Sequence, residues 1–266
     1  MKEYNFKKFL TIVKSAGFVD KRLFSSVNAV NFAYALFLIM RSEGASDSEV
    51  SSVVRRWLVM VLLTGRASGS FETAFERDLD RIDRYGAAKT LSEIEESELA
   101  DTFWDFGIPS RLTSSSVSNP QYLAFIASQI KTGARGFLSR HVTVQSLVEL
   151  QGDVHHLVPK DYLRKNGVND RRDYNQVANY AWTETFVNIR IGNREPAEYL
   201  AEIEKQIESQ TPTLGEINLL EDLEATFAEN AVPASLRDTT FENYDSFIEE
   251  RRKLMAQNLK EYYFSL

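Results

Sequence analysis

Apolar side chains recur at helical spacing through the first third of the chain. A nearly continuous apolar run at residues 27–40 predicts a largely buried helix, and Gly44 is placed to end it. Ser46 and Glu49 have the spacing of a capping box, which predicts that the next helix begins there. A further helix is expected at residues 71–82. This part of the chain is therefore predicted to be helical.

Helical patterns continue in the middle of the chain and return at its end. Residues 93–106 and 121–130 have helical periodicity, and the serine-rich stretch 114–118 predicts a loop between them. Residues 247–263 predict a final charged helix.

The pattern changes between residues 153 and 200. Residues 153–159 are β-prone and end in a proline, so we expect a short strand that runs into a loop. A long polar stretch separates them from a second expected strand at residues 177–182. Pro196 suits the first turn of the helix that follows. Two strands around a long loop and then a helix make a ββα outline.

The composition allows a buried core and excludes several kinds of site. The chain has 266 residues, of which 43% are hydrophobic, enough for one large domain or two small ones. It has no cysteine, which excludes disulfides, thiolate zinc sites and cysteine nucleophiles and fits a cytoplasmic protein. No segment resembles a signal peptide or a membrane span, so we expect no membrane partner.

The net charge of −7 is concentrated at the end of the chain. Residues 201–266 hold 6 Lys and Arg against 14 Asp and Glu, which leaves 25 against 24 for residues 1–200. An anionic substrate is therefore not excluded from the rest of the molecule.

Adjacent histidines mark the first expected strand. His155 and His156 are neighbours, and side chains of neighbours in a strand point to opposite faces. Near a strand end, one imidazole can then meet a metal while the other faces a water or a substrate. A neutral imidazole can take a proton from water at cellular pH. Farther along, Asn175, Asn179 and Asn188 carry amide oxygens, which are hard donors suited to Mg²⁺ or Mn²⁺.

Other residues near this segment have simpler interpretations. We interpret Asn175 as a turn or capping residue rather than a ligand. His141, next to Arg140, is interpreted as a surface or loop residue.

Three segments carry a resemblance to a known family: DVHHLVPK at 153–160, YNQVAN at 174–179 and NIRIGNREPAEYL at 188–200. Together they resemble the HNH (ββα-metal) domain of GmrSD-type proteins, which are modification-dependent, type IV restriction endonucleases of bacteria and archaea. A weaker likeness to helical regions of that family covers residues 56–79 and 247–254.

The resemblance implies a role for each matching residue. His156 would be the general base that activates water against a phosphodiester. Asn179 would be the middle asparagine, which ties down the loop between the strands and orients the base. His155, and Asn188 on a short helix, would hold one Mg²⁺ or Mn²⁺ ion that stabilises charge on the phosphate and the leaving oxygen. His155 stands where relatives often have an acidic residue, so Asp153 is the alternative ligand.

Basic residues cluster around the same segment, where seven acidic residues also lie between residues 151 and 200. The basic residues are expected to hold DNA phosphates if they share one face. Otherwise they belong to a solvated loop. The substrate-binding candidates are Lys160, Arg190 and Arg194; the whole basic set is Lys160, Arg164, Lys165, Arg171, Arg172, Arg190 and Arg194.

Full-length relatives also carry an N-terminal domain with an Asp-Gly-Gln-Arg-like motif that is linked to nucleotide hydrolysis. Nothing in this chain matches that motif. We therefore expect a separate nuclease subunit or a C-terminal fragment, partnered by a nucleotide-hydrolysing domain or subunit that this chain lacks.

These patterns predict a mainly α-helical protein with a small embedded ββα-metal (HNH) unit, an α+β fold. The expected domains are a helical domain at 1–145, the HNH unit at 146–205 and a C-terminal helical segment at 206–266 that packs on the rest. The expected activity is metal-dependent hydrolysis of DNA phosphodiester bonds, in defence against foreign, modified DNA. Two alternatives stay open: an inactive HNH-fold module that binds DNA or a partner, and an RNase with the same site.

Overall fold

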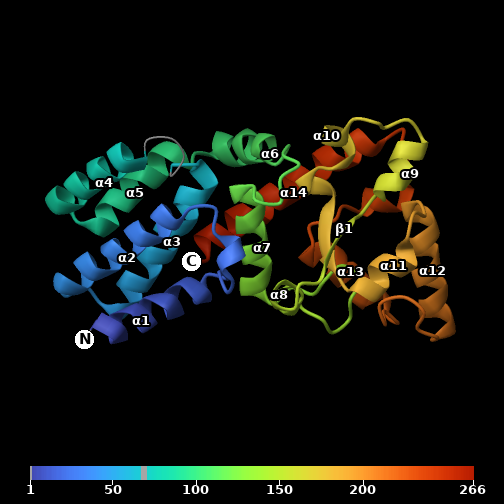
Figure 1. Cartoon of the computed structure of the whole chain (residues 1–266), viewed down its shortest axis with the longest axis horizontal. Helices are drawn as coiled ribbons and strands as arrows, with labels where there is room; N and C mark the ends of the chain where they lie inside the picture. Colours follow the sequence, from blue (N-terminus) through green and yellow to red (C-terminus); the bar gives the residue numbers. More distant parts are fainter. Residues whose placement is uncertain (1, 67–70) are drawn as a thin grey trace. The chain divides into compact units, whose positions relative to one another are not determined.

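The computed structural model describes residues 2–66 and 71–266. In this part the chain is mainly α-helical with a small two-stranded antiparallel sheet, as the hydrophobic pattern predicts (Figure 1). None of the helices in the described residues combines the length and apolar character that a membrane crossing requires. Residues 67–70, which belong to the weaker upstream resemblance, lie outside the described residues.

The chain forms two compact units that do not follow the predicted domains. The first comprises Met1–Ile108, Ser118–Ser128 and Leu259–Leu266, and the second comprises Pro109–Val117 and Gln129–Asn258. Residues 129–145, which we assigned to the helical domain, thus belong to the second unit together with the candidate site.

The first unit is built from helices that pack through aromatic side chains. Phe32 stacks on Trp57 with ring centroids 4.2 Å apart, and Phe75 lies 4.4 Å from Phe32. Ser46 caps the third helix by accepting the Glu49 N–H, as predicted. The elements are α1 (Lys2–Ser15), η1 (Lys21–Leu23), α2 (Val27–Ser42), α3 (Asp47–Thr64), α4 (Phe71–Tyr85), α5 (Ala87–Glu98) and η2 (Phe103–Gly107), with residues of α7 (Pro120–Thr132) and of α14 (Tyr244–Phe264).

The helix predicted at residues 93–106 is wrong as one element. Helix α5 ends at Glu98, and a π-helical segment, η2, follows from Phe103. The indole N–H of Trp104 donates to the carbonyl oxygen of Leu99 at 3.0 Å, which closes the turn between the two.

The second unit holds the sheet. Strands β1 (Asp153–His156) and β2 (Tyr180–Thr183) are antiparallel, with His155 opposite Ala181 and His156 opposite Tyr180. The other elements are α8 (Val144–Glu149), α9 (Lys160–Lys165), α10 (Arg171–Tyr174), η3 (Val177–Asn179), α11 (Thr185–Ile191), α12 (Pro196–Ser209), α13 (Leu220–Glu229) and η4 (Ala234–Asp238), with part of α6 (Ile108–Arg111), α7 and α14.

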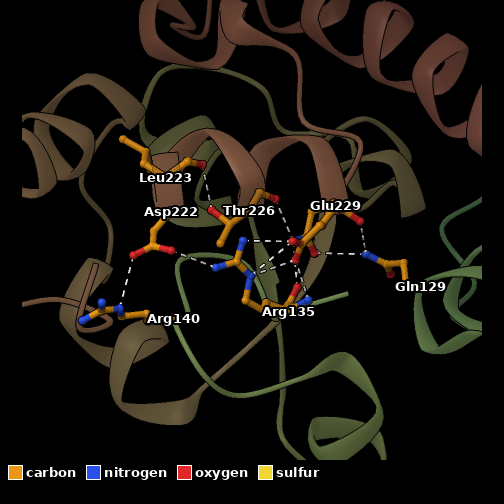
Figure 2. A network of polar contacts seen from close by, with 8 residues as sticks. Gln129, Arg135, Arg140, Asp222, Leu223, Thr226 and Glu229 are labelled. Carbon is orange, nitrogen blue, oxygen red and sulfur yellow. Dashed lines mark hydrogen bonds and ion pairs between the residues drawn. The ribbon is translucent and has the colours of Figure 1, made fainter. Parts of the chain in front are cut away.

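An ion-pair network fixes the loop that covers the free edge of β2. Figure 2 shows Arg135 between two carboxylates of α13, with its Nη1 3.1 Å from Asp222 and its Nη2 2.9 Å from Glu229. Arg140 pairs with the same Asp222 at 3.2 Å. In the loop so held, the N–H of Phe137 donates to the carbonyl oxygen of Trp182 at 2.7 Å. The outer edge of β2 is thereby hydrogen-bonded within the unit.

A buried arginine anchors the other end of β2. Arg251 of α14 is fully buried and donates from Nη1 to the carbonyl oxygen of Ala178 at 2.6 Å. Its Nη2 donates to the carbonyl oxygens of Tyr180 at 2.7 Å and Asn230 at 3.2 Å. The backbone on both sides of Asn179 is therefore fixed from α14.

Candidate functional site

Two strands and a short helix position the candidate site. Helix α11 begins two residues after β2 and packs against β1. It ends at Ile191, and the next residue, Gly192, has a φ of +59°, which glycine adopts without strain. The second strand was predicted from residue 177 but begins at Tyr180, because residues 177–179 form a 3₁₀ turn.

Four of the predicted site residues border one cavity of about 180 Å³. His155 and His156 come from the end of β1, Lys160 from the start of α9, and Asn188 from α11. The rest of the lining is Pro159, Asp161, Gly192 and Asn193. The cavity is thus lined by polar groups from residues 155–161 and 188–193.

A short chain of hydrogen bonds fixes the imidazole of His155. The amide nitrogen of Asn188 donates to the carboxylate of Asp153 at 3.3 Å, so its amide oxygen must face the other way. That oxygen lies 2.7 Å from Nδ1 of His155. Because an amide oxygen only accepts, the proton of His155 is on Nδ1 and the lone pair is on Nε2. In the described residues Nε2 is buried and has no hydrogen-bond partner.

His155 is kept neutral by its surroundings. Its side chain is 3% exposed and its ring is nearly parallel to that of Phe137, with centroids 6.4 Å apart. Burial lowers the pKa of His155 to about 4, although the bond to Asn188 acts in the opposite direction. The ring is therefore uncharged at neutral pH and retains a lone pair for a ligand or a proton.

His156 is held by Asn175, which also stands at the end of α10 as its capping residue, as predicted. Nε2 of His156 lies 3.0 Å from the amide oxygen of Asn175, which we had interpreted only as a turn or capping residue. The His156 ring also packs edge-on against Tyr180, with centroids 4.9 Å apart. Burial lowers the pKa of His156, while the bond to Asn175 opposes that shift. Contact with Asn175 depends on the path of the long loop, which no local pattern specifies.

Asn179 does not line the cavity and bonds to the loop after β1. Its amide oxygen accepts the N–H of Val158 at 2.9 Å, and its amide nitrogen donates to the carbonyl oxygen of Val158, also at 2.9 Å. A third bond runs from the amide nitrogen to the carbonyl oxygen of Tyr174 at 3.3 Å. The fully buried side chain thus joins the loop after β1 to the loop before β2.

Replacing Asn179 with alanine is expected to lower the free energy of unfolding by about 2–4 kcal/mol, because two buried backbone groups of Val158 lose their partner. Urea unfolding of the whole chain measures the loss. The matched control is Asn166→Ala on an exposed turn, expected to change stability by less than about 0.5 kcal/mol. Equal stability of the two variants would contradict the inference that the hydrogen bonds of Asn179 stabilise the loop after β1.

Of the two predicted arginines, Arg190 lies in the last turn of α11 and Arg194 in the loop between α11 and α12, and neither lines the cavity. Arg190 and Arg194 both bind the carboxylate of Glu202 in α12, at 3.0 and 2.6 Å. Burial alone would raise the pKa of Glu202, but the bonds from Arg194, Arg190 and Thr213 lower it overall. Of the three substrate-binding candidates, Lys160 borders the cavity, and it has no ion pair within the described residues.

The donors at the cavity are of the types that a hard divalent ion accepts, an imidazole nitrogen and an amide oxygen. Neighbouring ligands of octahedral Mg²⁺, each about 2.0–2.1 Å from the ion, lie about 3 Å apart. Nδ1 of His155 and Oδ1 of Asn188 are 2.7 Å apart, and the carboxylate of Asp153 is bonded to the same amide. An ion held by this pair requires Nδ1 to give up its proton, which the unpartnered Nε2 can take.

Comparison of the chain with protein-family models, with curated proteins and with solved structures found no match.

Proposed function

We propose that this chain is a metal-dependent HNH-type endonuclease that hydrolyses DNA phosphodiester bonds with one Mg²⁺ or Mn²⁺ ion. The main supporting observation is that His155, His156 and Asn188 border one cavity. The two histidines are neighbours in β1, and Asn188 lies on the helix that follows β2. The three resembling sequence segments point to the same residues.

In this proposal the chain's own residues carry the proton transfer. Nδ1 of His156 takes a proton from a water molecule, whose oxygen forms the new bond to phosphorus. The bond from phosphorus to the leaving sugar oxygen breaks, and that oxygen keeps the electron pair and is protonated from solvent. Lys160, at the edge of the cavity, contributes positive charge toward the phosphate. His155 and Asn188 would hold the ion, which supplies further charge stabilisation when bound.

The biological setting is proposed from the resemblance. A role in defence against foreign DNA with modified bases, a cytoplasmic location and a nucleotide-hydrolysing partner follow from the GmrSD-type family. The ββα arrangement itself addresses the phosphate group, so it favours no particular base.

The direct test is a nicking assay on supercoiled plasmid. We expect conversion to open-circle or linear DNA with Mg²⁺ or Mn²⁺, and complete loss with EDTA that is reversed by added metal. Plain DNA, DNA with glucosylated hydroxymethylcytosine and RNA are digested side by side. Cutting of RNA alone would identify an RNase, and binding of DNA without any cutting would identify an inactive binding module.

The ligand assignment is tested by metal titration of the same protein. We expect His155→Ala and Asn188→Ala to weaken Mn²⁺ binding at least tenfold in calorimetry. Asn193→Ala removes a lining residue without removing a proposed ligand and is the matched control. Unchanged Mn²⁺ affinity in both ligand variants would contradict the assignment.

A further inference from the structure

We propose that Asn175 is a positioning residue for His156: its amide oxygen accepts the Nε2–H and so leaves the lone pair on Nδ1 as the proton acceptor. The role in catalysis rests on the proposed function, whereas the placement of the proton does not.

The bond from His156 to Asn175 selects one of two tautomers. Asn175 Oδ1 is 3.0 Å from Nε2, and an amide oxygen can only accept, so Nε2 carries the proton. Within the described residues, no hydrogen bond holds Nδ1. A free lone pair on one nitrogen and a fixed N–H on the other is the arrangement that a general base requires.

The backbone of Asn175 does not explain why an asparagine stands there. Its φ of −108° is open to any residue, so no left-handed conformation calls for asparagine. Its N–H closes α10 by donating to the carbonyl oxygen of Arg171 at 3.1 Å, which needs no particular side chain. The side chain of Asn175 is therefore accounted for by its hydrogen bond with His156.

The segment around Asn175 is anchored independently of His156. The hydroxyl of Tyr244 donates to the carbonyl oxygen of Asp173 at 3.1 Å. The N–H of Val177 donates to the carbonyl oxygen of Ser114 at 2.8 Å, and Arg252 binds the side chain of Gln176. Contacts on both sides of Asn175 therefore fix the backbone that carries its side chain before any substrate arrives.

The neighbouring histidine has the opposite arrangement. Asn188 accepts from Nδ1 of His155, whereas Asn175 accepts from Nε2 of His156. Two adjacent imidazoles are thus placed in opposite tautomers by two amide oxygens. In the metal-free chain the lone pairs are left on Nε2 of His155 and Nδ1 of His156, so the two imidazoles carry their protons on different nitrogens.

Histidine-selective NMR on the ¹⁵N-labelled, metal-free whole chain tests the proposal directly. With three histidines in the chain, His141→Ala and His156→Ala assign the ring signals by subtraction. We expect the Nε2–H tautomer for His156 and the Nδ1–H tautomer for His155. In Asn175→Ala the His156 signals should move toward a tautomer mixture, while Asn175→Asp, which retains an acceptor oxygen, should keep the Nε2–H form.

Cleavage kinetics give the functional readout. Asn175→Ala should lower kcat by about ten- to a hundredfold with little change in KM, and Asn175→Asp should recover most of that loss. Asn166→Ala is the matched control and should cut like the wild type.

An Nδ1–H tautomer for His156 in the wild type, or the same tautomer and kcat in Asn175→Ala, would overturn the proposal. If the wild-type protein has the expected tautomers and cleaves no nucleic acid, the nuclease function alone is refuted. The two failures are therefore distinguishable.

Discussion

Replacing His156 with alanine is expected to slow metal-dependent DNA cleavage by about 10²- to 10⁴-fold, the usual contribution of a general base. The imidazole borders the cavity, with its N–H fixed on Nε2 and its lone pair on Nδ1. Removing it leaves the proposed ligands His155 and Asn188 in place, so Mn²⁺ should still bind. Single-turnover nicking of plasmid at saturating metal measures the rate.

His141→Ala is the control for this experiment. His141 is exposed, lies in the same compact unit and does not border the cavity. Its loss should leave the cleavage rate unchanged. Full activity in His156→Ala, with His141→Ala also active, would remove His156 from the mechanism. Circular dichroism of both variants checks that each is folded.

Arg251→Met is expected to lower the free energy of unfolding by about 3–5 kcal/mol, because several buried hydrogen bonds are lost at once. Three carbonyl oxygens, of Ala178, Tyr180 and Asn230, lose a buried donor, and an apolar chain of similar length cannot replace it. The loss should appear in urea unfolding. It should also reduce cleavage below the unfolding transition, because the backbone around Asn179 is no longer fixed.

An exposed arginine provides the comparison. Arg164 is more than half exposed and lies 3.6 Å from Asp161, so Arg164→Met should change stability by less than about 0.5 kcal/mol. A loss in Arg251→Met as small as that of Arg164→Met would show that the buried guanidinium contributes little beyond its packing.

Local signals predicted the helices well. The helix predicted at residues 27–40 is α2 (Val27–Ser42). The predicted N-cap Ser46 precedes α3, and Pro196 is the first residue of α12, as expected. These elements are specified by side chains within one or two turns of each other, which a sequence displays directly. The break at Leu99 was missed because apolar residues keep helical spacing on both sides of it, so periodicity gives no sign of the bend.

Placement of the site residues was predictable only in part. The strand pattern and the resemblance singled out His155, His156, Lys160 and Asn188, and these four residues border one cavity. The contact of Asn175 with His156 and the anchoring by Arg251 join residues 19 or more positions apart. Such contacts arise from the tertiary path of loops and helices, which neither spacing nor composition encodes.

The pairing of Arg190 and Arg194 with Glu202 has a consequence for how this surface would respond to ionic strength. A phosphate that binds either guanidinium competes with a carboxylate already there, so the contact is an exchange of counterions rather than a new attraction. Glu202, once released, would attract a cation from solution and offset part of the cation release that normally drives binding to nucleic acids. These two arginines would then contribute more to the orientation of a bound strand than to the salt dependence of its affinity.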